Sequence, residues 1–286
     1  MAQITAAMVK ELREMTGAGM MECKKALTEA DGNLEGAVDV LRTRGLAAVA
    51  KKAGRATNEG YVMAVTNDEA TAGAIVELKC ETDFVSGNEK FRGYVAKVAS
   101  AVMASKTTDV EALKAVEVEG ETVEAILTDC IHVMGENTEL ARVAYTEAPA
   151  VASYIHGTGK IGVLVEFDVE GIDATSAEFK QCGKDVAMQV AAIAPIAANR
   201  EDVDPAVVEH EMGIYKAQAA ESGKPENIQE KIATGRLEKF FKEQCLTEQA
   251  FVKDSDKTVT EYVNSVAKSL GGSIKVKSFT RFALGE

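Results

Sequence analysis

The stretch Thr82–Val85 reads Thr-Asp-Phe-Val and places an aromatic ring beside a carboxylate. The apolar run at 73–80 before it is typical of a buried strand, and Ser86–Glu89 after it has the Ser-x-x-Glu spacing of a capping box that begins a helix. A corner between strand and helix can present side chains outward, where their chemistry is binding rather than bond cleavage. Two interpretations fit this spacing. Either Phe84 and Asp83 face a partner, or Phe84 folds into the core and Asp83 solvates the turn.

Covalent or metal chemistry finds little support in the sequence. The three histidines, His132, His156 and His210, fall in different predicted elements without metal-ligand spacing. No nucleophile elbow and no defined Cys/His pair are present. Gly157–Lys160 ends like a phosphate-binding loop, but the chain then enters a strand rather than a helix, so we predict a hairpin turn. We expect no catalytic residue, no metal, no cofactor and no direct nucleotide binding.

Composition narrows the class of protein further. With 286 residues, of which 46% are hydrophobic, the chain is long enough for about two domains. Its net charge of −13 argues against general binding to nucleic acids or anionic membranes, which usually requires a basic stripe. No apolar run approaches the roughly 20 residues that span a bilayer.

The cysteines and the N-terminal residues indicate a compartment. Five widely spaced cysteines form neither a disulfide framework nor a Cys-x-x-Cys metal motif. The first twenty residues carry charges and lack the apolar segment of a secretory signal. We therefore expect a reducing, cytoplasmic location.

Residues 1–45 are predicted to form a small domain of three helices, similar to the ubiquitin-associated type. Thr5 caps the first helix, whose core-facing side holds Val9, Leu12 and either Met15 or Thr16. A turn at 17–19 follows. The third helix begins after Asn33, and Gly45 is predicted to end it.

The loop of this domain carries two consecutive methionines, Met20 and Met21. They are more than one small core readily buries, and methionine adapts well to binding surfaces, so partner contact is one interpretation and core packing the other. Arg13 and Lys24 lie near this loop and are either contacts or solvated charges.

Residues 46–59 form a basic, alanine-rich linker or short helix. Lys51, Lys52 and Arg55 are too few for a nucleic-acid site without an aromatic side chain for base stacking.

An internal repeat organises the rest of the chain. Gly73–Leu78 reads Gly-Ala-Ile-Val-Glu-Leu, and Gly162–Phe167 reads Gly-Val-Leu-Val-Glu-Phe. Later matches pair Phe91 with Phe179, Val98 with Val186, Thr122 with Thr258 and Gly135 with Gly271. The spacing grows between these matches, so the second copy contains an insertion of about 48 residues.

The insertion is predicted to be an antiparallel helical hairpin. Asp204 and Pro205 form an N-cap followed by a proline at the first helical position. The apolar residues that follow have coiled-coil spacing, and Ser222–Pro225 turns the chain. We expect Leu237, Phe240 and Phe241 to dock the base of the hairpin on the body.

Each copy reads strand, strand, helix, helix, strand, which indicates antiparallel sheets with helices on one face and an α+β fold. The predicted division is a three-helix domain at 1–45, a linker at 46–59, a first core subdomain at 60–148, a second at 149–200 and 247–286, and a coiled-coil hairpin at 201–246.

Four motifs together resemble the bacterial elongation factor Ts family. They are VKELREMTGAGMMECKKAL near the N-terminus, TDFV, HGTGKIGVLV, and SGKPE at the hairpin tip. The resemblance extends to the final RFALGE. It implies a guanine-nucleotide exchange factor, not an enzyme, whose partner is elongation factor Tu, the GTPase that delivers aminoacyl-tRNA.

The resemblance also implies roles for individual residues. Phe84 would wedge between two helices of the GTPase beside its nucleotide. Asp83 and its neighbours would help to shift the helix that positions the Mg²⁺ ligands, which would leave the phosphates uncompensated. The remaining residues that match family contact positions are Arg13, Met20, Met21, Lys24, Met134, Gly135 and His156. For His156, a satisfied histidine in a turn is an equal alternative.

A different class of function remains open from the residues alone. The three-helix domain and the coiled coil are also typical of a non-catalytic adaptor or a chaperone-type binding protein.

Overall fold

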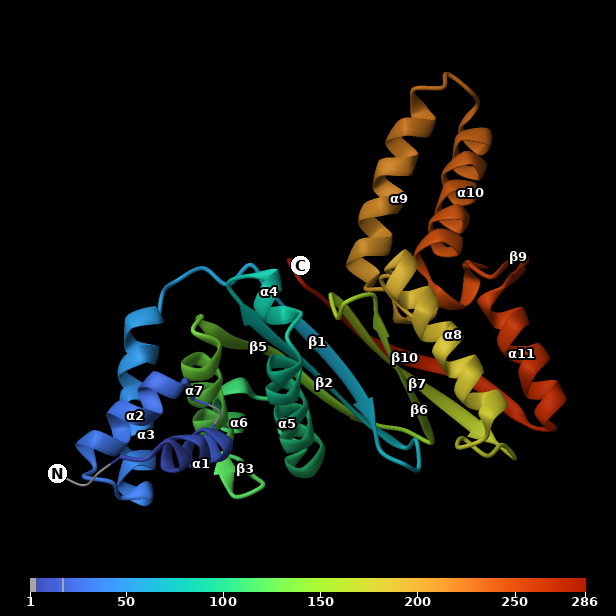
Figure 1. Cartoon of the computed structure of the whole chain (residues 1–286). Coiled ribbons are helices and arrows are strands. Elements are labelled where there is room, and N and C mark those ends of the chain that lie inside the picture. The colour runs from blue at the N-terminus through green and yellow to red at the C-terminus, as the bar shows by residue number, and fades with distance from the viewer. Residues whose placement is uncertain (1–3, 17) are drawn as a thin grey trace.

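The structure is a computed structural model that describes residues 4–16 and 18–286. Figure 1 shows a helical bundle near the N-terminus, a central body built around two sheets, and two helices that project from the body as an arm. No helix in the two described ranges has both the length and the apolar composition needed to cross a bilayer. The α-helices are α1 (Ala6–Thr16), α2 (Met20–Glu29), α3 (Leu34–Lys52), α4 (Asp83–Ser86), α5 (Glu89–Ser105), α6 (Val110–Lys114), α7 (Val123–Met134), α8 (Ala177–Ile193), α9 (Pro205–Ala220), α10 (Glu226–Gln244) and α11 (Val259–Leu270).

Two three-stranded antiparallel sheets form the centre of the body, with strand orders β1-β2-β5 and β10-β7-β6. The fold is therefore α+β, as the sequence predicts. The strands are β1 (Glu59–Thr66), β2 (Ala72–Cys80), β3 (Glu117–Val118), β4 (Glu121–Thr122), β5 (Thr138–Glu147), β6 (Ala150–His156), β7 (Ile161–Glu170), β8 (Ala250–Phe251), β9 (Asp254–Thr258) and β10 (Ser273–Ala283), with short 3₁₀ turns η1 (Arg200–Asp202) and η2 (Leu246–Glu248).

Side-chain alternation gives each sheet two different neighbours. In β2, Val76 and Leu78 point toward helices α5 and α7, where they share a cluster with Phe91 and Ile126. Ile75, which directly precedes Val76, faces the other way and packs on the second sheet. In β7 the same alternation directs Val165 and Phe167 toward α8 and α11, and Leu164 toward the first sheet. The body is therefore layered as helices, sheet, sheet, helices.

The repeated glycines lie where the two sheets meet. A Cβ atom on Gly73 would come within 2.9 Å of Leu164, and one on Gly162 within 2.5 Å of Val62. Each glycine thus permits the close approach of the opposite sheet. The sequence match between Gly73 and Gly162 therefore has a structural reason, because both glycines allow the two sheets to pack closely.

The N-terminal bundle follows its predicted pattern at most positions. Thr5 Oγ1 accepts a hydrogen bond from the Met8 amide, and Val9 and Leu12 are buried. Of the two candidates for the core-facing side, Thr16 is partly buried, whereas Met15 is 62% exposed. The turn predicted at 17–19 includes Gly17, which lies outside the described residues.

The prediction that Gly45 ends the third helix is wrong, because α3 continues to Lys52. Gly45 faces α7, where an added Cβ would lie 3.3 Å from Thr128 Cγ2. The glycine therefore serves close packing between helices rather than termination. Much of the segment expected as a linker, 46–59, is helical as a result.

The predicted capping box at Ser86–Glu89 is also wrong. Ser86 belongs to the one-turn helix α4, and the side chain of Asn88 caps α5 by accepting from the Lys90 amide at 2.9 Å. Val85 and Ser86 are buried, so this segment packs against the body before α5 begins.

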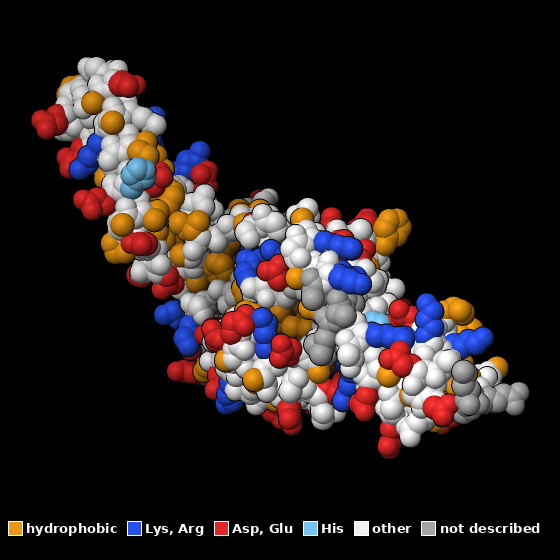
Figure 2. Space-filling view, turned by 90° about the vertical axis from the view of Figure 1, so that its left-hand side faces the viewer, with side chains coloured by type: hydrophobic (Ala, Val, Ile, Leu, Met, Phe, Trp, Pro, Cys, Tyr) orange, Lys and Arg blue, Asp and Glu red, His pale blue; other side chains and the backbone are white. Residues whose placement is uncertain are grey.

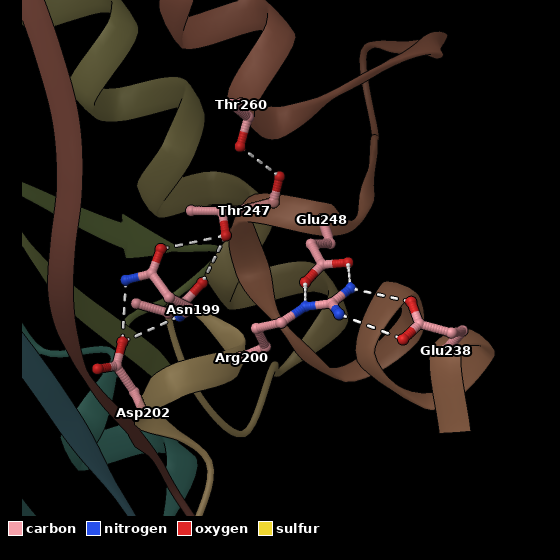
Figure 3. Close-up of polar contacts among 8 residues, drawn as sticks. Asn199, Arg200, Asp202, Glu238, Thr247, Glu248 and Thr260 are labelled. Carbon is pink, nitrogen blue, oxygen red and sulfur yellow. Dashed lines mark hydrogen bonds and ion pairs between the residues drawn. The ribbon is translucent and has the colours of Figure 1, made fainter. Parts of the chain in front are cut away.

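The arm begins as expected at Asp204, whose side chain accepts from the Ala206 amide, with Pro205 at the first helical position. At its base, Leu237 and Phe241 are buried in a cluster that Phe240 also contacts. Arg200 lies above the Phe241 ring and pairs with Glu238 of α10 and Glu248 of η2 (Figure 3). The predicted docking of the hairpin base is confirmed.

Candidate functional site

The corner after β2 exposes its aromatic ring. Thr82 has extended backbone angles, α4 makes a single turn, and Phe84 is 88% exposed. Val85, the next residue, is buried in the cluster that contains Phe91. The interpretation that places Phe84 in the core is therefore wrong, and the interpretation that presents the ring outward is confirmed. Asp83 is exposed as well, whereas the side chain of Val85 anchors the corner.

A carboxylate from another segment braces this corner. Glu136 Oε2 accepts hydrogen bonds from the amides of Glu81 and Thr82 at 3.1 and 3.0 Å, and Oε1 accepts from Thr82 Oγ1 at 2.6 Å. In return, Glu81 accepts from the Asn137 amide at 2.6 Å, which lowers the pKa of Glu81. The backbone groups that carry Phe84 are thus hydrogen-bonded before any partner arrives.

The same loop brings two other predicted residues to the corner. Gly135 ends α7 in the left-handed region, with φ +79°, and lies directly before Glu136. Met134 is partly buried against the cluster under the corner. Met134 and Gly135 therefore neighbour Thr82–Val85 in space, although about fifty positions separate them in sequence.

Sequence reasoning missed Glu81 and Glu136. A signal was available, because a strand that ends at an exposed corner leaves backbone amides without partners. A glutamate directly after a helix-ending glycine is well placed to accept them. Which glutamate does so depends on how α7 packs on the sheet.

The predicted residues of the N-terminal bundle form a separate exposed surface. Met20 and Met21 are 60% and 64% exposed, so the interpretation that buries them is wrong. Met15 adds a third exposed methionine, and Arg13 and Lys24 are also exposed. Thioether side chains near the end of α1 and at the start of α2 give this surface an adaptable apolar character.

His156 lies at the end of β6, and its Nδ1 is 3.0 Å from the hydroxyl of Tyr154. The turn that follows it packs on the start of β1, where the Gly159 carbonyl accepts from the Val62 amide. That part of β1 pairs with the end of β2, with Glu59 opposite Cys80. His156 is therefore on the same end of the body as the corner. Residues 157–160 form the predicted hairpin turn.

Exposed apolar side chains also occur on the arm. Figure 2 shows hydrophobic side chains along one side of the arm toward its base. Val207 and Ile214 of α9 are among those exposed. The bundle, the corner and the arm thus each expose apolar side chains.

The described ranges contain no group of three or more His, Cys, Asp or Glu residues arranged to hold a metal ion. The five cysteines are all buried. Burial raises the pKa of the Cys80, Cys130 and Cys182 thiols to about 12, so these groups stay protonated.

Comparison with known proteins gives one consistent result. The family model described as Elongation factor TS matches residues 81–286. The chain is 50% identical to Elongation factor Ts of Trichlorobacter lovleyi, over 99% of this chain and 93% of that protein. It is 49% identical to Elongation factor Ts of Clostridioides difficile, over 100% and 94%, and 47% identical to that of Clostridium botulinum, over 99% and 93%. The chain belongs to the elongation factor Ts family.

Proposed function

We propose that this protein is a guanine-nucleotide exchange factor in translation elongation. It binds elongation factor Tu carrying GDP, disturbs the contacts of the GTPase with Mg²⁺ and phosphate, and promotes GDP release so that GTP can load. The observation that carries the proposal is the 88% exposure of Phe84 on a corner whose backbone is already braced by Glu136.

In this proposal Phe84 enters between two helices of the GTPase beside its nucleotide. Asp83, exposed next to it, helps to shift the helix that positions the Mg²⁺ ligands. Once the ion is lost, the charge of the phosphates is uncompensated and GDP leaves. Val85 stays buried in this protein and holds the corner in place.

Magnitudes indicate that the ring does not act alone. Burying one phenylalanine side chain stabilises a complex by about 1.5–3 kcal/mol. Shifting a two-state equilibrium from 1:99 to 99:1 requires about 5.5 kcal/mol of differential binding. Further contacts are needed, and the proposal assigns them to Met20, Met21, Met134, Gly135 and His156, with Arg13 and Lys24 beside the methionines.

Coupling between the two ligands of the GTPase is reciprocal. If this protein weakens the binding of GDP, then GDP must weaken the binding of this protein by the same factor. The complex with nucleotide-free elongation factor Tu should therefore dissociate when GDP or GTP is added.

The test is the release rate of fluorescent GDP from elongation factor Tu, measured with the wild-type protein and with Phe84→Ala. We expect the wild type to stimulate GDP release strongly. The release rate with the Phe84→Ala variant should be lower by severalfold or more. The melting temperature should not change, because Phe84 contributes almost nothing to the core.

Val252→Ala is the matched control, since it truncates another exposed apolar side chain, in the segment between β8 and β9. It should leave exchange unchanged. Equal stimulation by wild type and Phe84→Ala would overturn the proposal. Capture of unfolded clients without any effect on GDP release would favour a chaperone-type adaptor instead.

A further inference from the structure

Helix α7 supports two of the exposed surfaces described above, the corner with Phe84 and the bundle surface with Met20 and Met21. Its C-terminal end leads through Gly135 to Glu136, which braces the corner that carries Phe84. Its side packs against α3 of the N-terminal bundle, where Gly45 lies close to Thr128. The distance between Phe84 and the exposed methionines Met20 and Met21 therefore depends on how the bundle is fixed on α7.

Among the described residues, two polar contacts connect the bundle to α7. Lys52, the last residue of α3, donates to the carbonyl of Ile131 at 2.9 Å, where a cation also complements the helix dipole. His132 Nε2 is buried and makes no aligned hydrogen bond, while Glu22 Oε2 of α2 lies 3.0 Å away. The His132 side chain is only 9% exposed, so a small rotation that completes this pair would satisfy a buried polar atom.

Among the residues whose side chains the structure describes, the buried residues of the bundle form a cluster separate from the one beneath α5 and α7. A cleft of about 740 Å³ lies between the two parts, with Met15, Leu41 and His132 among its lining residues. Because this cleft separates part of the bundle from α7, polar contacts help to set the orientation of the two parts.

The short connector after α3 is held by the corner itself. The Arg55 carbonyl accepts from the Asn137 side chain at 2.9 Å, and the Arg55 guanidinium lies 3.4 Å from Glu81. Both partners belong to the segments that brace Thr82. The connector thus limits how far the bundle can move once its contacts with α7 are broken.

We propose that His132 is a positioning residue that acts through Glu22. Together with Lys52, this pair fixes the bundle on α7, so that Met20, Met21 and Phe84 meet the GTPase as one preorganised surface. The role in exchange rests on the proposed function, whereas the docking of the bundle does not.

Preorganisation has a specific kinetic consequence. A docked bundle offers its methionines at a fixed distance from Phe84, so binding loses less conformational freedom. An undocked bundle remains tethered and still binds, but at a lower effective concentration. Loss of the pair should therefore raise the concentration needed for half-maximal exchange and leave the rate at saturation unchanged.

Docking is measured on the free protein with spin labels at Lys25→Cys in α2 and Lys90→Cys in α5, both exposed positions. The native thiols are buried, so labelling is selective. We expect a narrow distance distribution for otherwise wild-type protein and a broad one for His132→Leu and for Glu22→Ala. His132→Gln, whose amide nitrogen can reach the same carboxylate, should stay narrow.

Glu29→Ala is the matched control, because it removes an ion pair with Arg44 inside the bundle and does not involve α7. Its distribution should stay narrow. If His132→Leu lowers the melting temperature, the test of docking rests on Glu22→Ala alone. Glu22 is half exposed, so its truncation leaves the core intact. A narrow distribution in Glu22→Ala would overturn the docking role.

Exchange assays separate the two proposals. We expect Glu22→Ala to raise the half-maximal concentration severalfold at an unchanged maximal rate, and His132→Gln to behave as the wild type. If the bundle undocks but exchange kinetics stay the same, the positioning role is wrong and the proposed function stands. If Phe84→Ala also leaves exchange unchanged, the proposed function itself fails.

Discussion

The corners after β2 and β7 occupy equivalent places in the two copies of the repeat but differ in what they expose. The spacing that matches Gly73 with Gly162 pairs Phe84 with Asp173 and Val85 with Ala174. Val85 and Ala174 are both buried, at 8% and 9% exposure, and each anchors its corner in the core.

The residues before these anchors have opposite properties. Phe84 projects an apolar ring into solvent. Asp173 Oδ1 instead accepts from the Thr175 hydroxyl and amide at 2.7 and 2.8 Å, and these bonds lower the pKa of Asp173. At this corner the fold accommodates a polar residue, whose side chain accepts hydrogen bonds from within its own turn. An exposed ring at position 84 is therefore not a requirement of the fold, which argues for a role in binding.

The largest effect on exchange is expected when Phe84 is replaced by aspartate, the residue at the equivalent position of the second corner. Phe84→Asp removes about 1.5–3 kcal/mol of apolar burial in the complex and adds a charge there. Stimulated GDP release should fall about tenfold or more, since each 1.4 kcal/mol corresponds to a factor of ten. The far-ultraviolet circular dichroism and the melting temperature should match the wild type. A fall in thermal stability as large as that of a core substitution would contradict the comparison.

The bracing of the first corner is tested by Glu136→Ala. It leaves the amides of Glu81 and Thr82 without their acceptor, which costs about 1–3 kcal/mol when such groups are buried. We expect a lower free energy of unfolding in urea and severalfold slower exchange. Glu139→Ala, which loses only an exposed bond with Thr57, should change neither. Normal exchange by Glu136→Ala would show that the corner does not need this brace.

The arm, present only in the second copy, offers a smaller effect with a defined pH dependence. Arg200 lowers the pKa of Glu248, so their pairing stabilises the fold above the ordinary glutamate pKa of about 4.3 and is lost as pH falls through the lower folded-state value. Because Arg200 is 36% exposed, Arg200→Ala should cost about 1 kcal/mol or less at pH 7.

Urea unfolding at pH 7 and pH 3 checks this prediction. The difference between wild type and Arg200→Ala should shrink at pH 3. Lys239→Ala, which removes an exposed pair within α10, serves as the control and should show little difference at either pH. A difference that grows on acidification would contradict the assigned partner.

The smallest effect is expected at the second corner. Asp173→Ala removes the acceptor of Thr175, so the melting temperature should fall slightly. Exchange should be unaffected, because this corner has no exposed ring. A loss of exchange comparable to that of Phe84→Asp would show that the two corners act alike.

Sequence patterns predicted the repeated elements well, because each strand and helix carries a local signal. Strand β2 covers the apolar run at 73–80, and the cap at Asp204 is where the motif places it. Local rules failed where packing overrides them. Gly45 lies within a helix because α7 packs against it, and Ser86 is buried rather than free to cap.

The candidate site was only partly accessible to the same reasoning. Spacing alone left the direction of Phe84 open, because the choice depends on whether Val85 or Phe84 fills the core. The brace by Glu136 and the contact between His132 and Glu22 join segments far apart in the chain. No local pattern specifies such pairs, since they follow from how α7 is placed on the sheet and on the bundle.

The most direct measurement of the central claim follows the ring itself. A single fluorophenylalanine at position 84 gives a fluorine signal whose solvent isotope shift reports contact with water. We predict that this shift is full in the free protein, disappears on binding nucleotide-free elongation factor Tu, and returns when excess GDP is added. A ring that stays in contact with water throughout the complex would contradict the account.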